Sequence, residues 1–232
     1  MGKTNNMAKV MRLLQFTDSA FPVGTFSFSN GLETASFEGI VKDAKTLESF
    51  ARSQSHQAAF SDGVACILTH RAFLDKNYEK CKEIDKFLFG FKMNDEARLM
   101  ATRMGKKLAE LAVRLYDNAF IKDWLKEIGE GQTPGMYPVA QGMIFALAGI
   151  SEKDLFCSHQ YGVINMVLGA ALRCVKVSHY DTQLILEKLS EEIAGLYDEA
   201  SKMDLNDMHA FYPVLDMLAS LHEKGNMRMF MN

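Results

Sequence analysis

Apolar side chains recur at helical spacing along most of this chain. Between residues 95 and 115 one such stripe consists of Leu99, Met104, Leu108, Leu111 and Leu115. Lysines and arginines occupy the opposite side of the same predicted helix. Similar patterns predict helices at residues 7–18, 30–37, 44–74, 78–91, 119–128, 138–148, 151–175, 181–196 and 213–224. No alternating run predicts a β-hairpin. We therefore expect an all-α fold: a single-domain bundle of about ten helices spanning residues 1–232, with a flexible C-terminal tail at residues 225–232.

Polar residues that favour helix starts support these boundaries. Asp43, Asn94 and Asp181 can cap helices, Ser151 stands at capping spacing from Asp154, and Asn30 at capping-box spacing from Glu33. Gly63 can break the helix predicted for residues 44–74. The Gly-rich stretch at residues 129–135 is the clearest internal loop and could separate two halves. One domain is favoured, because the apolar helices next to this loop would otherwise lack cover.

Composition and charge restrict the classes of partner. Of the 232 residues, 48% are hydrophobic and only four are proline, and the net charge of −3 comes from interspersed charges. No basic stripe indicates nucleic acid, and no polybasic cluster indicates a membrane surface. The longest apolar stretches, residues 138–150 and 161–177, are interpreted as buried helices of a soluble protein. The N-terminus lacks a signal-peptide pattern, so we expect a cytoplasmic protein.

Motifs for catalysis or metal binding are absent or incomplete. The chain has no phosphate-binding loop and no nucleophile elbow. Its four cysteines form no CxxC pair, and its six histidines are scattered. We therefore assign no catalytic residue, no metal site and no cofactor, and we do not expect an enzyme. Two alternatives remain: a metal-binding protein that uses Cys66 and His70, four residues apart on a helix, and a helical enzyme with a carboxylate pair such as Glu33 and Asp62.

Two apolar segments lie in parts of the chain that are normally exposed to water, a terminus and a loop. The terminal run contains Met227, Arg228, Met229 and Phe230. Each large apolar side chain gains about 1.5–3 kcal/mol on burial, so this tail is expected to enter a pocket in its own body or in a partner. The second segment includes Phe21, Pro22, Gly24, Phe26 and Phe28. It either fills the core or forms a binding face, and the core is favoured from the residues alone.

Both segments resemble parts of the UreF family of urease accessory proteins. Residues 13–33 contain the L-L-Q opening, Pro22-Val23-Gly24 and Gly31-Leu32-Glu33. Further similarities follow in the same order, at Glu96-Ala97-Arg98 through Arg103-Met104-Gly105, Ala171-Leu172-Arg173 through Asp181-Thr182-Gln183, Pro213-Val214-Leu215-Asp216, His222-Glu223 and Arg228-Met229-Phe230. The chain departs from the family pattern at Lys176–Ser178, Thr182, Tyr137 and Phe26, and this puts local turns and hydrogen bonds in doubt.

The resemblance implies a helical, dimeric scaffold that is not an enzyme. It implies binding to UreD (also called UreH), recruitment of the GTPase UreG, and nickel delivery to apo-urease. On this hypothesis the tail residues Met227, Arg228, Met229 and Phe230 enter a UreD pocket, and Phe21, Pro22, Gly24 and Phe26 line the same face. Glu33, His222 and Glu223 would support the tail. The dimer interface and the UreG surface are not assigned.

Overall fold

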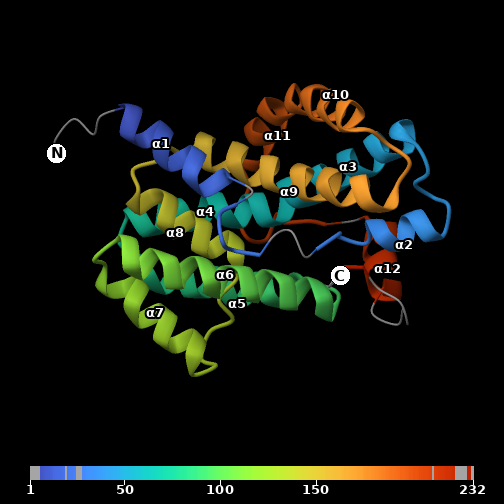
Figure 1. Ribbon diagram of the computed structural model, residues 1–232. Helices are drawn as coiled ribbons and strands as arrows, with labels where there is room; N and C mark the ends of the chain where they lie inside the picture. The colour runs from blue at the N-terminus through green and yellow to red at the C-terminus, as the bar shows by residue number, and fades with distance from the viewer. Residues whose placement is uncertain (1–5, 19, 25–27, 211, 223–228, 231–232) are drawn as a thin grey trace.

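The computed structural model describes residues 6–18, 20–24, 28–210, 212–222 and 229–230, and the all-α prediction is confirmed for them: they form helices and no strand. Figure 1 shows their arrangement. The helices are α1 (Asn6–Thr17), α2 (Leu32–Phe37), α3 (Ala44–Ala58), the π-helix η2 (Ala59–Gly63), α4 (Val64–Leu74), α5 (Tyr78–Phe91), α6 (Asp95–Leu115), α7 (Ala119–Gly129), α8 (Tyr137–Leu147), α9 (Glu152–Cys174), α10 (His179–Ser190), α11 (Ile193–Ala200) and α12 (Pro213–His222).

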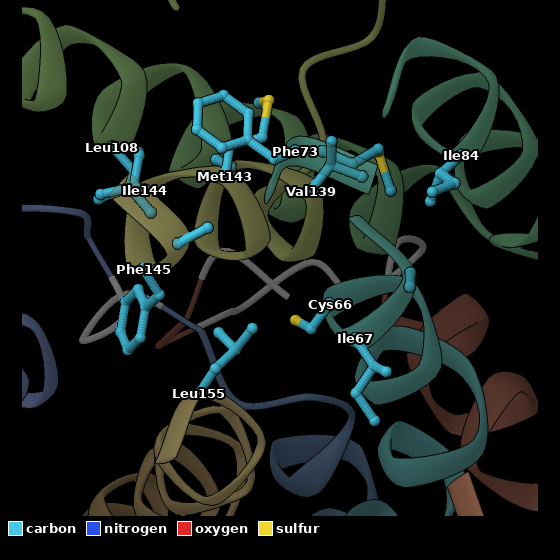
Figure 2. Close-up of a cluster of buried hydrophobic side chains, with 14 of the residues drawn as sticks. Cys66, Ile67, Phe73, Ile84, Leu108, Val139, Met143, Ile144, Phe145 and Leu155 are labelled. Carbon is cyan, nitrogen blue, oxygen red and sulfur yellow. The ribbon is translucent and has the colours of Figure 1, made fainter. Parts of the chain in front are cut away.

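The larger hydrophobic cluster is centred on α8, which packs against α4 on one side and α6 on the other. Helix α8 is buried along most of its length, as its continuous apolar sequence predicts. Gly142 allows this approach, because a Cβ atom there would lie 2.7 Å from Thr69 Cβ and 2.8 Å from the Cys66 carbonyl oxygen. Figure 2 shows α8 side chains such as Met143 and Phe145 in this cluster, together with Cys66 and Leu155 from α4 and α9.

A second hydrophobic cluster lies between α3 and α9, with α2, α10 and α12 around it. Its buried members come from five helices and the tail, and include Leu32, Leu47, Phe50, Leu168, Ile185, Leu215 and Phe230. In Figure 1, α10 and α11 lie over α9 and α3, while α12 lies near α2. This cluster therefore joins α2, from the early part of the chain, to α12 and Phe230, from its last part.

Three predicted helix starts are confirmed by side-chain hydrogen bonds. Asp43 accepts from the Thr46 amide at 2.9 Å, Asn94 from the Ala97 amide at 2.7 Å, and Ser151 from the Asp154 amide at 3.2 Å. The prediction for Asp181 is wrong by one turn. Ser178 is the N-cap of α10, and Asp181 is the third helical residue of a capping box. The helix also ends at Ser190, before α11 begins at Ile193.

The break predicted at Gly63 is instead a π-helical turn. Helices α3, η2 and α4 follow each other without a gap, and residues 59–63 take the wider π geometry. Gly63 is required for packing, since a Cβ atom there would approach the Phe156 ring to 2.7 Å. A π-turn inside an α-helix shifts the side chains that follow it and is frequent at functional sites.

The glycine-rich loop before α8 is tied to α5 by one carboxylate. Asp85 is fully buried and accepts hydrogen bonds from the Thr133 hydroxyl (2.6 Å), the Gly135 amide (2.9 Å) and the Met136 amide (2.7 Å). Burial raises the pKa of Asp85, and these hydrogen bonds oppose that shift. The loop is therefore fixed to the body of the protein.

Helix α9 has the length and apolar composition of a membrane-spanning helix, but 56% of its most apolar window is buried inside the molecule. Its polar positions include Gln160, which is fully buried, and Ser158 and His159, which are 6% and 5% exposed. Its second half belongs to the hydrophobic cluster that it forms with α3. These features agree with the prediction of a core helix in a soluble protein.

The contact between α6 and the start of α8 yields a test of the packing. A Cβ atom at Gly105 would lie 2.0 Å from the Gly135 carbonyl oxygen and 2.7 Å from the Met136 carbonyl carbon. Because backbone blocks the methyl group, Gly105→Ala should lower the free energy of unfolding by about 3 kcal/mol. Gly90→Ala is the matched control, since no atom lies within 4 Å of its added Cβ. Urea denaturation should show Gly90→Ala to be neutral or slightly stabilising; equal effects of the two substitutions would contradict this packing.

Candidate partner-binding site

A buried histidine joins three helices at the end of α12. His222 is 4% exposed, and its two ring nitrogens face two carboxylates. Nε2 lies 2.9 Å from Glu33 Oε2 on α2, and Nδ1 lies 3.0 Å from Glu96 Oε2 in the first turn of α6. Both nitrogens can donate only in the imidazolium form. The geometry therefore suits a positive ring between two negative groups.

Glu33 also holds the backbone of the chain end. Its Oε1 accepts from the Met229 amide at 2.8 Å, and its Oε2 accepts from the Phe230 amide at 3.1 Å. Burial acts to raise the pKa of Glu33, but the hydrogen bonds from His222 and from these two amides outweigh it and leave the pKa below its ordinary value. The ionised carboxylate is thus the form that the tail stabilises.

The capping box predicted for Asn30 and Glu33 is wrong. The N-cap of α2 is Gly31, and no side chain caps it. Asn30 and Gly31 have φ angles of 52° and 77°, a left-handed turn that brings α2 against α12. A Cβ atom at Gly31 would lie 3.1 Å from the Ala219 amide nitrogen. The carboxylate of Glu33 instead binds His222 and the backbone amides of Met229 and Phe230, so it does not cap α2.

Phe230 occupies a site in its own subunit. Its side chain is 5% exposed and belongs to the cluster between α3 and α9. The guanidinium carbon of Arg173, on α9, lies 4.0 Å from the ring centroid, within cation–π range. The hypothesis placed this ring in a UreD pocket, whereas in the single chain it contributes to the intramolecular core. Its role toward a partner stays a prediction.

Met229 has the opposite environment. Its side chain is 59% exposed, although its amide is held by Glu33. Helix α12, which carries His222, exposes three further large apolar residues at positions three and four apart, which puts them on one helical face. These are Val214 (57%), Met217 (62%) and Leu221 (52%). Three apolar side chains exposed on one face of α12 are a feature of partner-binding surfaces.

The segment before α2 is divided between the core and the surface. Val23 and Phe28 are buried in the larger cluster, and Phe21 packs edge-on against Phe16 with ring centroids 5.4 Å apart. Pro22 and Gly24 are exposed. The core role that the residues alone favoured is thus confirmed for Phe28. Val23 lines a surface pocket together with Arg173, whose guanidinium covers Phe230, so this segment and the tail meet the same helix, α9.

Several predicted residues lie outside the described part of the chain: Phe26, Glu223, Met227 and Arg228. The structure brings together Glu33, His222, Met229 and Phe230. Sequence reasoning assigned no role to Glu96 or Arg173. Glu96 stood within a segment of family resemblance, which was the available signal. Arg173 also stood within such a segment, but no pattern linked it to an aromatic ring.

The alternative metal site at Cys66 and His70 has other partners. Cys66 Sγ lies 3.3 Å from the Pro138 carbonyl oxygen, and burial raises the pKa of this thiol well above its ordinary value. Figure 2 shows Cys66 among apolar side chains. His70 Nε2 contacts the Ile150 carbonyl oxygen at 2.9 Å. Among the residues described, no three His, Cys, Asp or Glu side chains form a group suited to a metal ion.

The carboxylate pair considered for catalysis also has separate partners. Glu33 interacts with His222 and the tail, whereas Asp62 on η2 pairs with Lys92 at 2.7 Å. The two carboxylates therefore do not share a partner. The geometry therefore suits attachment of a chain end better than catalysis.

Glu33 should contribute measurably to stability. Glu33→Ala removes the acceptor of three hydrogen bonds, including one from a buried histidine, so the free energy of unfolding should fall by about 2 kcal/mol in urea denaturation at pH 7. Glu38→Ala is the control, because Glu38 is exposed at the end of the same helix. Its effect should stay within about 0.5 kcal/mol. Equal stability of the two variants would show that the Glu33 contacts carry no net energy.

Comparison with known proteins identifies the family of this chain. A family model described as UreF matches residues 41–190. The chain is 45% identical over 223 residues to urease accessory protein UreF 2 of Brucella canis, covering 96% of this chain and 92% of that protein. It is 41% identical over 227 residues to urease accessory protein UreF of Yersinia pestis (strain Pestoides F), covering 98% of this chain and 100% of that protein. The chain therefore belongs to the UreF family of urease accessory proteins.

Proposed function

We propose that this protein is a cytoplasmic scaffold of urease maturation that works as a homodimer. It joins UreD (UreH), recruits the GTPase UreG and modulates its activity, and supports nickel insertion into apo-urease; it catalyses no reaction itself. Family membership supports the maturation role. The observation that carries the binding role is the chain end clamped by Glu33, with one side chain turned inward and the next turned outward.

The clamp suggests how the tail works in binding. Two consecutive amides bind one carboxylate, so the backbone at Met229 and Phe230 is held at a fixed place on α2. Phe230 then acts as an anchor in its own subunit, covered by Arg173. Met229 and the exposed face of α12 supply the apolar contact to UreD. Met227 and Arg228 precede this point in the sequence and are proposed to extend the same surface.

Preorganisation is the physical advantage of this arrangement. A free terminal segment loses conformational entropy when it binds, about 1–2 kcal/mol for each residue whose backbone becomes ordered. A tail that is already held by its own subunit avoids this loss at the anchored residues. The apolar side chains that face outward can then contribute directly to affinity. Exposed Pro22 and Gly24 are proposed to contact the same partner.

Met229 and Phe230 should give opposite results when substituted. Met229→Ala should leave the free energy of unfolding within about 0.5 kcal/mol of the parent and weaken UreD binding about tenfold or more in a titration with purified UreD. Phe230→Ala should lower the free energy of unfolding by about 2 kcal/mol, because it empties an internal site. Leu74→Ala is a matched control, since Leu74 is also 59% exposed and should change neither quantity.

Other results for these two variants would contradict the proposed anchor role of Phe230. If Phe230→Ala left stability unchanged while abolishing UreD binding, the anchor role would be wrong, and the ring would enter UreD as the sequence hypothesis states. If Met229→Ala bound UreD like the parent, the exposed contact would be elsewhere.

Assembly tests the scaffold role as a whole. Co-expression with UreD and UreG, followed by size-exclusion chromatography with light scattering, should give one complex that contains all three proteins and two copies of this chain. A truncation lacking residues 225–232 should lose UreD while remaining helical by circular dichroism. Recovery of the full complex with that truncation would exclude the tail as the binding element.

A further inference from the structure

A cavity of about 140 Å³ lies between the two hydrophobic clusters and has no role in the tail site. None of the three residues of the Glu33–His222–Glu96 cluster lines it. Its walls come from α3, η2, α6, α8, α9 and α12, and Met93, which is 75% exposed, stands at its rim. The apolar part of the wall includes Phe91, Met100, Met104 and Met166.

A buried imidazole nitrogen in this wall lacks a partner. His159 is 5% exposed, and its Nδ1 lies 2.8 Å from Gln141 Oε1. Because an amide oxygen can only accept, Nδ1 carries the proton and Nε2 presents a lone pair. Burial lowers the pKa of His159 to about 4, so the ring is neutral at pH 7. Nε2 is buried and has no hydrogen-bond partner in the described structure, a state that costs about 1–3 kcal/mol.

A carboxylate oxygen in the same wall is also unpaired. Asp62 is carried by the π-turn η2, and its Oδ2 accepts from Lys92 at 2.7 Å. Its Oδ1 is buried without a partner among the described residues. Asp216, on α12, accepts from Gln57 Nε2 at the long distances of 3.4 and 3.5 Å. The lining thus holds two carboxylates and one ammonium group, and its unsatisfied atoms are acceptors.

These features define the chemistry of an occupant. It must donate hydrogen bonds, it gains from a positive charge, and its body must be small and apolar enough to pack on methionine and phenylalanine. A metal ion fits poorly, because no three His, Cys, Asp or Glu side chains of the described residues form a group that could hold one, and Lys92 already pairs with Asp62. The volume of about 140 Å³ is close to that of a cavity of about 150 Å³ that can hold benzene, so a molecule of that size fits.

We propose that this cavity binds a small protonated primary amine of about six heavy atoms or fewer. Its ammonium group donates to Asp62 Oδ1 and His159 Nε2, and its carbon chain packs against Met100, Met104 and Met166. The π-turn that carries Asp62 is the local feature that places the carboxylate in this wall. The site is independent of the proposed binding to UreD, so either can fail without the other.

The probe is n-butylammonium chloride, compared with n-butanol, which has the same chain without the charge. The ring resonances of His159 are followed by NMR in the full-length labelled protein at pH 7. Butylammonium should shift them saturably, and butanol should bind about tenfold more weakly, as expected for loss of one charge-assisted hydrogen bond. The resonances of His70, whose Nε2 contacts the Ile150 carbonyl oxygen, should not move.

Asp62→Asn keeps the shape of the side chain and removes its charge, so it should weaken butylammonium binding about tenfold. Asp198→Asn, at an exposed position on α11, is the control and should bind like the parent. If Asp62→Asn does not fold, the comparison of the two probes on the parent protein decides. The proposal is overturned by the absence of a saturable His159 shift, by equal binding of butanol, or by a His159 response to Ni²⁺ in place of the amine.

Discussion

The contact on which this side of the molecule depends is the buried imidazole of His222 between Glu33 and Glu96. Each of these residues belongs to a different helix, and the two glutamates lie 189 and 126 positions before the histidine in the sequence. Charges taken out of water are stabilised only when their partners are well placed. Here both ring nitrogens and both carboxylates have partners at about 3 Å. Loss of any one member would leave a buried hydrogen-bonding group without its partner, so this cluster links α2, α6 and α12.

The tail is an extension of that cluster. Glu33 uses His222 for one hydrogen bond and the amides of Met229 and Phe230 for two more. The chain end is therefore attached by backbone groups, which any residue would supply, while the side chains are left to pack or to face outward. Phe230 fills the cluster between α3 and α9 under Arg173. This explains why an apolar terminus remains compatible with a soluble protein.

Local features of this fold were predictable from sequence, and long-range pairings were not. The caps at Asp43, Asn94 and Ser151 depend on atoms within a few residues, so spacing alone identified them. The buried α8 followed from its uninterrupted apolar sequence. The π-turn at residues 59–63 was mistaken for a break at Gly63; the lack of a side chain there accommodates the ring of Phe156 on another helix, a neighbour that spacing does not reveal.

The same distinction applies to the site. Glu33 and His222 were assigned to supporting the tail, which their contacts agree with. The partners Glu96 and Arg173 could not be found from spacing, since each becomes a neighbour only after α6 and α9 have packed. Asn30 illustrates the competition between local and distant partners. Its spacing from Glu33 is typical of a capping box, but the carboxylate forms stronger bonds with a distant histidine and with the chain end.

Neighbouring residues in the tail thus serve the fold and the surface at once. With both amides bound to one carboxylate, the side chains of Met229 and Phe230 have unlike surroundings: one is 59% exposed and the other 5%. The inward residue packs in the cluster between α3 and α9, and the outward residue is left at the surface. Composition alone describes both residues as large and apolar. Their different exposure is seen only once the backbone of both residues is bound to Glu33. A hydrophobic terminus therefore does not by itself indicate how many of its residues a partner binds, because part of its apolar surface is already used by its own subunit.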